Sequence, residues 1–159
     1  MYEKIVVPLD GSKIGEAALP YVEDLVSKFS SEVEVEVVLL QVLSSVTHAV
    51  LSGPAIVDIP YTDKEIEQIK NHILNYLNKA GEMLRNKGVM VTTKVAIGDT
   101  SEEIIKTAEE INANFIAMST HGRSGLSRLA FGSITEKVLR REGNIPIIVV
   151  RAQEQAEKE

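Results

Sequence analysis

The sequence predicts an α/β fold: a single domain with a doubly wound, five-stranded parallel sheet and helices on both faces. Short apolar and β-branched runs alternate along the chain with segments whose apolar residues recur at helical spacing. With 159 residues and 44% hydrophobic content, the chain can bury one sizeable core, and it shows no internal repeat or linker. If the first three strands run outwards and the fourth returns beside the first, the strand order is 3-2-1-4-5. The domain covers residues 1–151, and residues 152–159 form a flexible charged tail.

The first predicted strand, residues 5–9, is short and buried, and it ends in Asp10-Gly-Ser, a turn and helix-start signal. Residues 13–29 follow with helical spacing, and Pro20 kinks this helix or marks its effective start. The second strand, residues 33–40, begins with glutamates that alternate with valines and continues as an unbroken apolar run. We therefore expect it to be half exposed at its beginning and buried on both faces later.

Residues 44–61 form a loop of unusual length and apolarity. A loop this long is more often functional or disordered than a mere connector. The sequence leaves open whether it is a lid over a ligand or a docking surface.

Two capping boxes mark helix starts in the second half of the chain. Thr62 and Glu65 open a long helix with one apolar stripe, which ends at Gly88, and Thr100 and Glu103 open the next helix. The elements predicted after Gly88 are a strand over residues 89–97, a helix over 101–111, a strand over 115–118, a helix over 133–141 and a strand over 145–151.

Composition excludes several classes of protein. The formal net charge is -6, from 17 basic and 23 acidic residues, which argues against nucleic acid as a partner. The chain has no cysteine, which excludes disulfides, thiolate metal sites and thiol catalysis. The amino terminus lacks the basic and apolar regions of a signal peptide, and no apolar run approaches the roughly 20 residues that span a bilayer. We expect a cytoplasmic protein with no membrane partner and, from the unsuitable spacing of its histidines, no metal site.

The loop after the fourth predicted strand is rich in glycine. Gly122, Gly125 and Gly132 fall within eleven residues, and Ser133 follows the last of them. Glycine lets a phosphate approach the backbone closely, and a helix amino terminus supplies free N–H groups and a favourable partial charge. A strand, a glycine-rich loop and a helix in this order predict a phosphate cradle, beside which Arg123 can offset phosphate charge.

The strand order places this loop opposite the end of the first strand. Open α/β sheets bind ligands at the carboxyl ends of their strands, in the crevice where the strand order reverses. In the predicted order that crevice lies between the first and fourth strands, so residues 8–12 and 119–122 face each other.

Three segments of the chain resemble the universal stress protein family. They are IVVPLDGS at residues 5–12, MSTHGRSG at residues 118–125 with FGS at residues 131–133, and IPIIVVR at residues 145–151. The resemblance covers residues 2–151, with residues 44–61 as its least typical part. The family's ATP-binding members resemble the pattern G-x2-G-x9-G-[S/T], in which Gly122, Gly132 and Ser133 match and Ser119 replaces the first glycine.

The resemblance implies a stress-response regulatory protein that binds ATP, or AMP or ADP, with Mg²⁺. Asp10 would hold the adenosine portion through its carboxylate, with Pro8 on the same wall, and the backbone of Val42 would meet the adenine edge. The residues implied to border the ribose and phosphates are Met118, Ser119, His121 and Gly122, and those implied to bind the outer phosphates are Gly132, Ser133 and Ile134. The family also implies a homodimer that pairs through the last strand, from Ile145 to Val150.

Several of these residues have purely structural explanations. Asp10 alone is most simply a helix N-cap. Ser133 with Glu136 forms a third capping box, a role compatible with phosphate binding at the same helix end. His121 lacks partners at triad spacing, and we assign it no chemistry.

Other functions remain open. The chain lacks G-x4-G-K-[ST], so it is primarily a binding protein with at most slow ATP hydrolysis and no assigned catalytic residue. A receiver-type phosphoacceptor lacks its second acidic residue and its lysine here, and a flavin-mononucleotide carrier lacks a loop rich in serine and threonine after the first strand. The main alternative is a nucleotide-free dimeric protein-interaction module of the same fold. The presence of Ser119 in place of the first glycine of the pattern leaves this alternative open.

Overall fold

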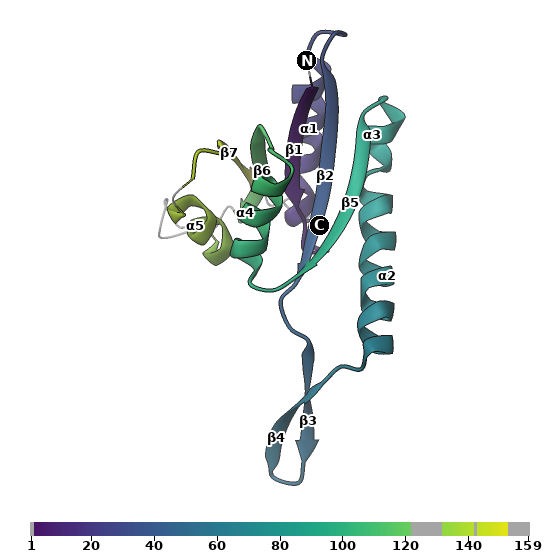
Figure 1. The fold of residues 1–159 in the computed structure, drawn as a ribbon, viewed down its shortest axis with the longest axis vertical. Helices are drawn as coiled ribbons and strands as arrows, with labels where there is room; N and C mark the ends of the chain where they lie inside the picture. Colours follow the sequence, from purple (N-terminus) through teal and green to yellow (C-terminus); the bar gives the residue numbers. More distant parts are fainter. Residues whose placement is uncertain (1, 122–131, 142, 153–159) are drawn as a thin grey trace, which may run out of the picture.

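The computed structural model describes residues 2–121, 132–141 and 143–152, in which strands and helices alternate (Figure 1). The first elements are β1 (Tyr2–Pro8), the 3₁₀ helix η1 (Gly15–Ala17), α1 (Ala18–Ser27), β2 (Glu34–Leu43), β3 (Thr47–Ser52), β4 (Ala55–Pro60) and α2 (Asp63–Ala80). The remaining elements are α3 (Glu82–Asn86), β5 (Met90–Ile97), α4 (Thr100–Glu110), β6 (Phe115–His121), α5 (Ser133–Arg140) and β7 (Ile147–Ala152). The predicted flexible tail lies outside the described residues from residue 153 onwards.

Five strands form one parallel sheet in the order β5-β2-β1-β6-β7. Numbered along the chain, these strands follow the order 3-2-1-4-5, so the predicted fold is confirmed. β1 pairs with β2 along its whole length, but it is in register with β6 only where Ile5 meets Phe115 and Val6 meets Ile116. The order reverses between β1 and β6, and their pairing stops before their carboxyl ends. This is the edge at which an open α/β sheet binds ligands.

Helices cover both faces of the sheet, and each face has its own apolar layer (Figure 1). On one face, residues such as Ile5 pack with α1, α2 and α3, where Leu77 is fully buried. On the other face, Val6 packs with α4 and α5, where Ile104 and Val138 are buried. Adjacent residues of β1 therefore point into different layers, which explains why its sequence is apolar throughout. None of the helices in the described part of the chain is long and apolar enough to cross a membrane.

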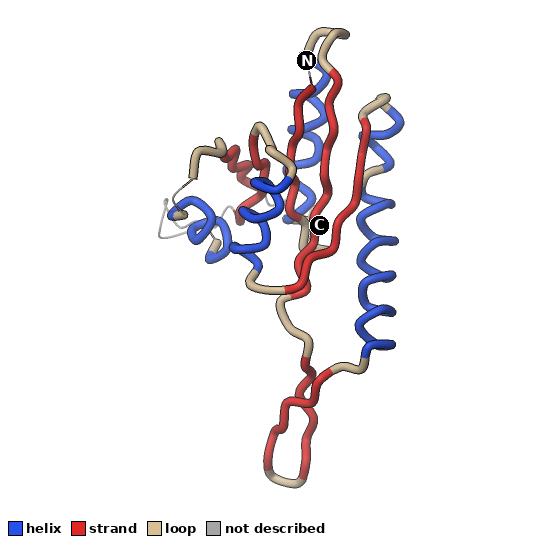
Figure 2. Tube along the Cα trace, in the orientation of Figure 1, coloured by secondary structure: helices blue, strands red, loops and turns tan. Residues whose placement is uncertain are grey.

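The prediction of a loop over residues 44–61 is wrong. Residues 47–60 form an antiparallel hairpin of β3 and β4, which Figure 2 shows extending away from the five-stranded sheet. Gly53, with φ of 62°, supplies the left-handed conformation that a two-residue hairpin turn needs at its first position. Leu51 and Ile56 pair across the strands and remain 74% and 75% exposed. The hairpin therefore adds almost nothing to the core of the domain.

Two predicted helices begin or end differently from expectation. The helix predicted over residues 13–29 starts effectively at Ala18, so Pro20 lies in its first turn, where proline is tolerated. The long helix predicted to end at Gly88 is interrupted at Gly81, which separates α2 from α3. A Cβ at Gly81 would lie 2.9 Å from Cγ1 of Val91. The glycine lets the helix pass close to the sheet.

One of the three predicted capping boxes forms. Thr62 Oγ1 accepts a hydrogen bond from the amide of Glu65, whose carboxylate accepts from the amide of Thr62. The box predicted at Thr100 is wrong, because Asp99 is the N-cap of α4. Its Oδ1 accepts from the amide of Glu102 at 3.1 Å. The box predicted at Ser133 is also wrong, because α5 begins at Ser133 after Gly132, without a side-chain cap.

Candidate functional site

A cavity of about 120 Å³ lies at the carboxyl ends of β1 and β6, where the strand order reverses. Five of the residues that the sequence singled out line it together: Pro8, Asp10, Met118, Ser119 and Ile134. They come from β1, from the segment after it, from β6 and from the start of α5, so residues more than 100 positions apart converge. The two strand ends that were expected to face each other therefore share one cavity.

The rest of the lining was not predicted. It consists of Leu9, Gly15, Thr100, Ile104 and Thr135. Thr100 and Ile104 belong to α4, which begins just after β5 ends at the same edge of the sheet. The signal for them was present in the sequence, because every helix that follows a parallel strand starts at the carboxyl edge. Apolar side chains from both α4 and α5 thus line the cavity.

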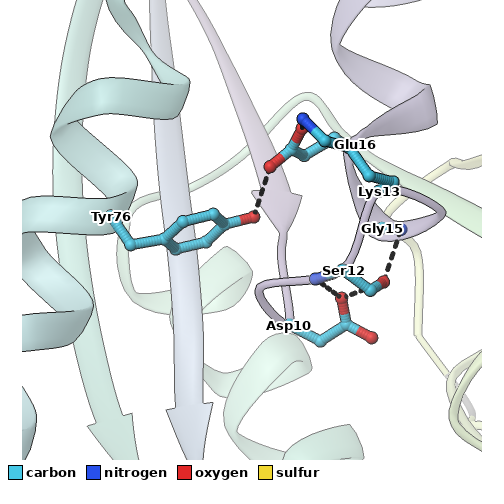
Figure 3. Close-up of polar contacts among 6 residues, drawn as sticks. All are labelled: Asp10, Ser12, Lys13, Gly15, Glu16 and Tyr76. Carbon is cyan, nitrogen blue, oxygen red and sulfur yellow. Dashed lines mark hydrogen bonds and ion pairs between the residues drawn. The ribbon is translucent and has the colours of Figure 1, made fainter.

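Asp10 organises a tight turn after β1 and does not act as a helix N-cap. Its Oδ1 accepts from the amide of Ser12 at 2.9 Å and from the Ser12 hydroxyl at 2.6 Å. The Ser12 hydroxyl oxygen in turn accepts from the amide of Gly15 at 2.9 Å. Figure 3 shows this chain of hydrogen bonds, with the second carboxylate oxygen of Asp10 pointing away from Ser12. A Cβ at Gly15 would collide with Asp10 Oδ1, so only glycine allows this close approach.

Ser119 connects the end of β6 to the segment of residues 9–17, between β1 and α1, which we call the β1–α1 segment. Its hydroxyl donates to the carbonyl oxygen of Gly15 at 2.7 Å. The Ser119 hydroxyl oxygen also accepts from the amide of Ala18 at 3.0 Å. Ala18 is the first residue of α1 and is buried, and the first amides of a helix have no partner within the helix. Ser119 therefore serves as a remote cap for α1.

A third contact ties the β1–α1 segment to α2. The Tyr76 hydroxyl donates to Glu16 Oε1 at 3.1 Å, and Lys13 Nζ lies 3.3 Å from Glu16 Oε2 (Figure 3). Burial raises the pKa of the Tyr76 phenol well above its usual value, and the charge of Glu16 and the hydrogen bond to it raise it further. The phenol thus stays protonated and keeps donating at neutral pH. The segment that carries Asp10 is held from two sides, by β6 and by α2.

The amino terminus of α5 adjoins the cavity through Ile134 and Thr135. The amide of Gly132 donates to Thr120 Oγ1 at 3.1 Å, so in this arrangement it serves the protein itself. A Cβ at Gly132 would meet Thr120 Oγ1 at 3.9 Å, an ordinary contact, so the backbone there does not require glycine for space. Ser133 is exposed at the first position of the helix.

The structure leaves part of the predicted site undescribed. Gly122 and Arg123 lie outside the described residues, as does the side chain of His121, whose backbone ends β6. Val42 packs in the same apolar cluster as Met118 but does not line the cavity. Within the described ranges, no group of histidine, aspartate and glutamate side chains has the arrangement of a metal site.

The fold and the site can be compared with known proteins. A model of the universal stress protein family matches residues 1–151. The universal stress protein YxiE of Bacillus subtilis is 30% identical over 95% of this chain and 100% of its own length. The universal stress protein MJ0577 of Methanocaldococcus jannaschii is 29% identical over 95% of this chain and 96% of its own length.

Solved structures show the same fold. The structure of MJ0577 covers 98% of this chain and 99% of its own, with a TM-score of 0.62 and 28% identity. A family protein from Arabidopsis thaliana, solved with AMP bound, covers 96% of this chain and 93% of its own, with a TM-score of 0.63 and 16% identity. The family match spans almost the whole chain. The chain belongs to the universal stress protein family.

Proposed function

We propose that this chain is a regulatory protein of the stress response that binds an adenine nucleotide, ATP or its products AMP and ADP, at the carboxyl ends of β1 and β6. The observation that supports this most strongly is the cavity at the point where the strand order reverses, with the Asp10 carboxylate held at its rim. In open α/β folds, this is where nucleotides bind. The AMP-bound protein of the same fold makes adenine the first base to test.

Asp10 suits the nucleoside end of such a ligand. A carboxylate only accepts hydrogen bonds, so it pairs with ribose hydroxyls or an exocyclic amine and repels phosphate. One of its oxygens is occupied by Ser12, and the other points away from that turn (Figure 3). Pro8, Met118 and Ile134 supply apolar surface for a base or a sugar. The proposed nucleoside subsite is therefore the described cavity itself.

The phosphates would extend towards the start of α5. A cavity of about 120 Å³ holds only part of a nucleotide, since pockets for complete small ligands measure roughly 300–1,000 Å³. Ser133 and Ile134 begin α5, whose amino terminus carries a partial positive charge and free amides. The backbone around Gly122 and the side chain of Arg123 are proposed to complete the phosphate subsite, and Mg²⁺ would arrive with the phosphates of ATP.

We propose binding without efficient catalysis. The sequence has no phosphate-loop lysine, and ATP would act by shifting an equilibrium between conformations or partners through its differential affinity. For a reversible sensor of this kind we expect a Kd in the micromolar range, about -8 kcal/mol. Hydrolysis, if measured, should be slow enough that nucleotide binding and release control the protein.

Isothermal titration of the nucleotide-stripped protein with ATP and Mg²⁺, AMP, and inorganic tripolyphosphate tests the proposal. Asp10→Asn should weaken the binding of AMP and ATP and leave the affinity for tripolyphosphate unchanged. Asp58→Asn, which alters an exposed carboxylate on β4, serves as the matched control and should bind like the parent. Absence of binding of any adenine nucleotide at millimolar concentration would refute the proposed function, and equal losses for AMP and tripolyphosphate would refute the role of Asp10.

A homodimer through the last strand is the second part of the proposal. β7 is an edge strand of the sheet, and its residues from Ile147 to Val150 are only partly buried. An apolar edge strand with one unpaired side invites pairing with an identical strand. Light scattering at micromolar concentration should give twice the monomer mass of 17.4 kDa, and a mass near 17.4 kDa would contradict the dimer. A dimer that binds no nucleotide would favour the alternative function, a protein-interaction module.

A further inference from the structure

The hydroxyl of Ser119 joins two parts of the site that are distant in sequence. It donates its one proton to the carbonyl oxygen of Gly15, and it accepts from the amide of Ala18; these partners are 104 and 101 residues away. A hydroxyl has a single proton to donate, so this one is committed to the protein itself. Ser119 lines the cavity, but its polar group is directed to the β1–α1 segment.

The bond to Gly15 continues into the turn that holds Asp10. The amide of Gly15 donates to Ser12 Oγ, and the Ser12 hydroxyl donates to Asp10 Oδ1 at 2.6 Å (Figure 3). Gly15 also lies against that carboxylate, since a Cβ there would collide with Asp10 Oδ1. A displacement of Gly15 therefore changes the position of the carboxylate directly. A series of hydrogen bonds runs from β6, through Gly15 and Ser12, to Asp10.

We propose that Ser119 is a positioning residue that sets nucleoside affinity by holding the β1–α1 segment, and with it the carboxylate of Asp10, against the end of β6. This inference rests on the proposed nucleotide-binding function. Glycine or alanine at position 119 cannot make either hydrogen bond. The amide of Ala18 would then lose the Ser119 oxygen as an acceptor, and Gly15 would lose its bond to β6 while keeping the one to Ser12.

The competing explanation is that the Ser119 hydroxyl binds the phosphates directly. The two roles predict different losses. If Ser119 bound phosphate directly, its removal would weaken the binding of tripolyphosphate as much as that of AMP. The loss would also be independent of Asp10. A positioning residue affects only ligands that contain the nucleoside, and its effect disappears once Asp10 itself is changed.

The test uses the full chain and calorimetric titration with AMP and with inorganic tripolyphosphate. We expect Ser119→Ala to lower the affinity for AMP about tenfold, which corresponds to the loss of one hydrogen bond. The affinity for tripolyphosphate should stay unchanged. Ser119→Thr keeps the hydroxyl and should restore affinity to within about threefold, a difference of about 0.7 kcal/mol. In an Asp10→Asn background, Ser119→Ala should have no further effect on AMP. Ser27→Ala, which removes an exposed hydroxyl at the far end of α1, is the matched control.

Each of three results would overturn the positioning role. Ser119→Ala could bind AMP as tightly as the parent, or its loss of AMP affinity could be fully additive with that of Asp10→Asn. The third result is an equal loss of affinity for tripolyphosphate. If the parent binds no nucleotide, the proposed function fails, and amide exchange of the ligand-free protein decides the positioning role. Ser119 does not touch the amides of Ser12 and Gly15 directly, so faster exchange at both in Ser119→Ala supports it. Unchanged exchange at these two amides overturns it.

Discussion

Replacing Gly15 with alanine would place a methyl group against the carboxylate of Asp10. The Cβ would collide with Oδ1 of Asp10 and would lie 3.3 Å from Asp10 Cγ and 3.3 Å from Ser12 Oγ. Gly15 is not among the described glycines with a positive φ. The added methyl group therefore causes a steric conflict without backbone strain. Asp10 is exposed and can rotate away. Its Oδ1 then gives up both hydrogen bonds to Ser12.

The effects on stability and on binding should separate. Two hydrogen bonds of an exposed carboxylate are replaced by bonds to water, so their loss costs about 1 kcal/mol. Alanine in place of glycine raises the free energy of unfolding by about 0.4–1 kcal/mol, because it restricts the conformations of the unfolded chain. The melting temperature should therefore change by less than about 4 °C for a domain of this size. A displaced carboxylate loses the proposed charged hydrogen bond to the nucleoside, which contributes about 1.5–3 kcal/mol of binding free energy. Its loss lowers AMP affinity about 10- to 150-fold.

Differential scanning calorimetry and AMP titration of Gly15→Ala measure the two effects on one sample. Gly143→Ala is the matched control, because nothing lies within 4 Å of a Cβ at Gly143. Parental AMP affinity in Gly15→Ala would show that the position of Asp10 does not determine binding. A fall in melting temperature well beyond about 4 °C would show that the segment supports the fold and not only the site.

Three further results are expected. Gly81→Val should lower the free energy of unfolding in urea by about 1–3 kcal/mol, because even a Cβ comes within 2.9 Å of Val91 Cγ1, and an unchanged midpoint would contradict close packing there. Hydrogen bonds from the Ser101 hydroxyl and, to a lesser extent, from the amide of Glu102 lower the pKa of the Asp99 carboxyl. The ionised carboxylate therefore stabilises the fold above its unfolded-state pKa, and this stabilisation is lost as the pH falls through the lower folded-state pKa. Urea titrations between pH 6 and 2 should show a smaller acid-dependent loss for Asp99→Asn than for the parent, and identical pH profiles would argue against this cap. Replacing residues 47–60 with a short Gly-Ser linker should leave the melting temperature within about 4 °C of the parent, because the hairpin buries little, whereas a large fall would show that it packs on the domain.

The sheet and the edge at which the cavity lies could be predicted because they depend on patterns that repeat along the chain. Five apolar runs separated by helical segments specify parallel strands with crossovers, and the reversal of strand order then selects one edge. Pro8, Asp10 and Met118 gather at that edge as expected. Their positions follow from the ends of β1 and β6 alone, so no knowledge of side-chain contacts was needed.

The hydrogen bonds of the site could not be predicted, because they join residues that are unrelated in spacing. Nothing in the sequence links Ser119 with Gly15, 104 residues away, since the contact exists only after β6 has docked beside β1. Local capping was ambiguous in a different way. Asp99 with Glu102 and Thr100 with Glu103 are overlapping candidate caps one residue apart. The one that forms uses aspartate, which is preferred over threonine at the N-cap.

The hairpin was missed because its apolar residues have no core to mark their orientation. Strands are usually recognised by alternation between a buried and an exposed face. In β4 every residue is exposed, so neither face is constrained and the sequence shows no alternation. The turn at Gly53-Pro54 was the available signal, since glycine there supplies the positive φ of a tight hairpin.

The place where the hairpin leaves the domain has an evolutionary consequence. The chain departs after β2 and returns before α2, so its length between these points can change while the register of every sheet strand is preserved. Insertions at such an exit are tolerated far better than changes within a packed element. Selection can therefore lengthen, shorten or recharge this hairpin while the cavity at the carboxyl ends of β1 and β6 is inherited intact.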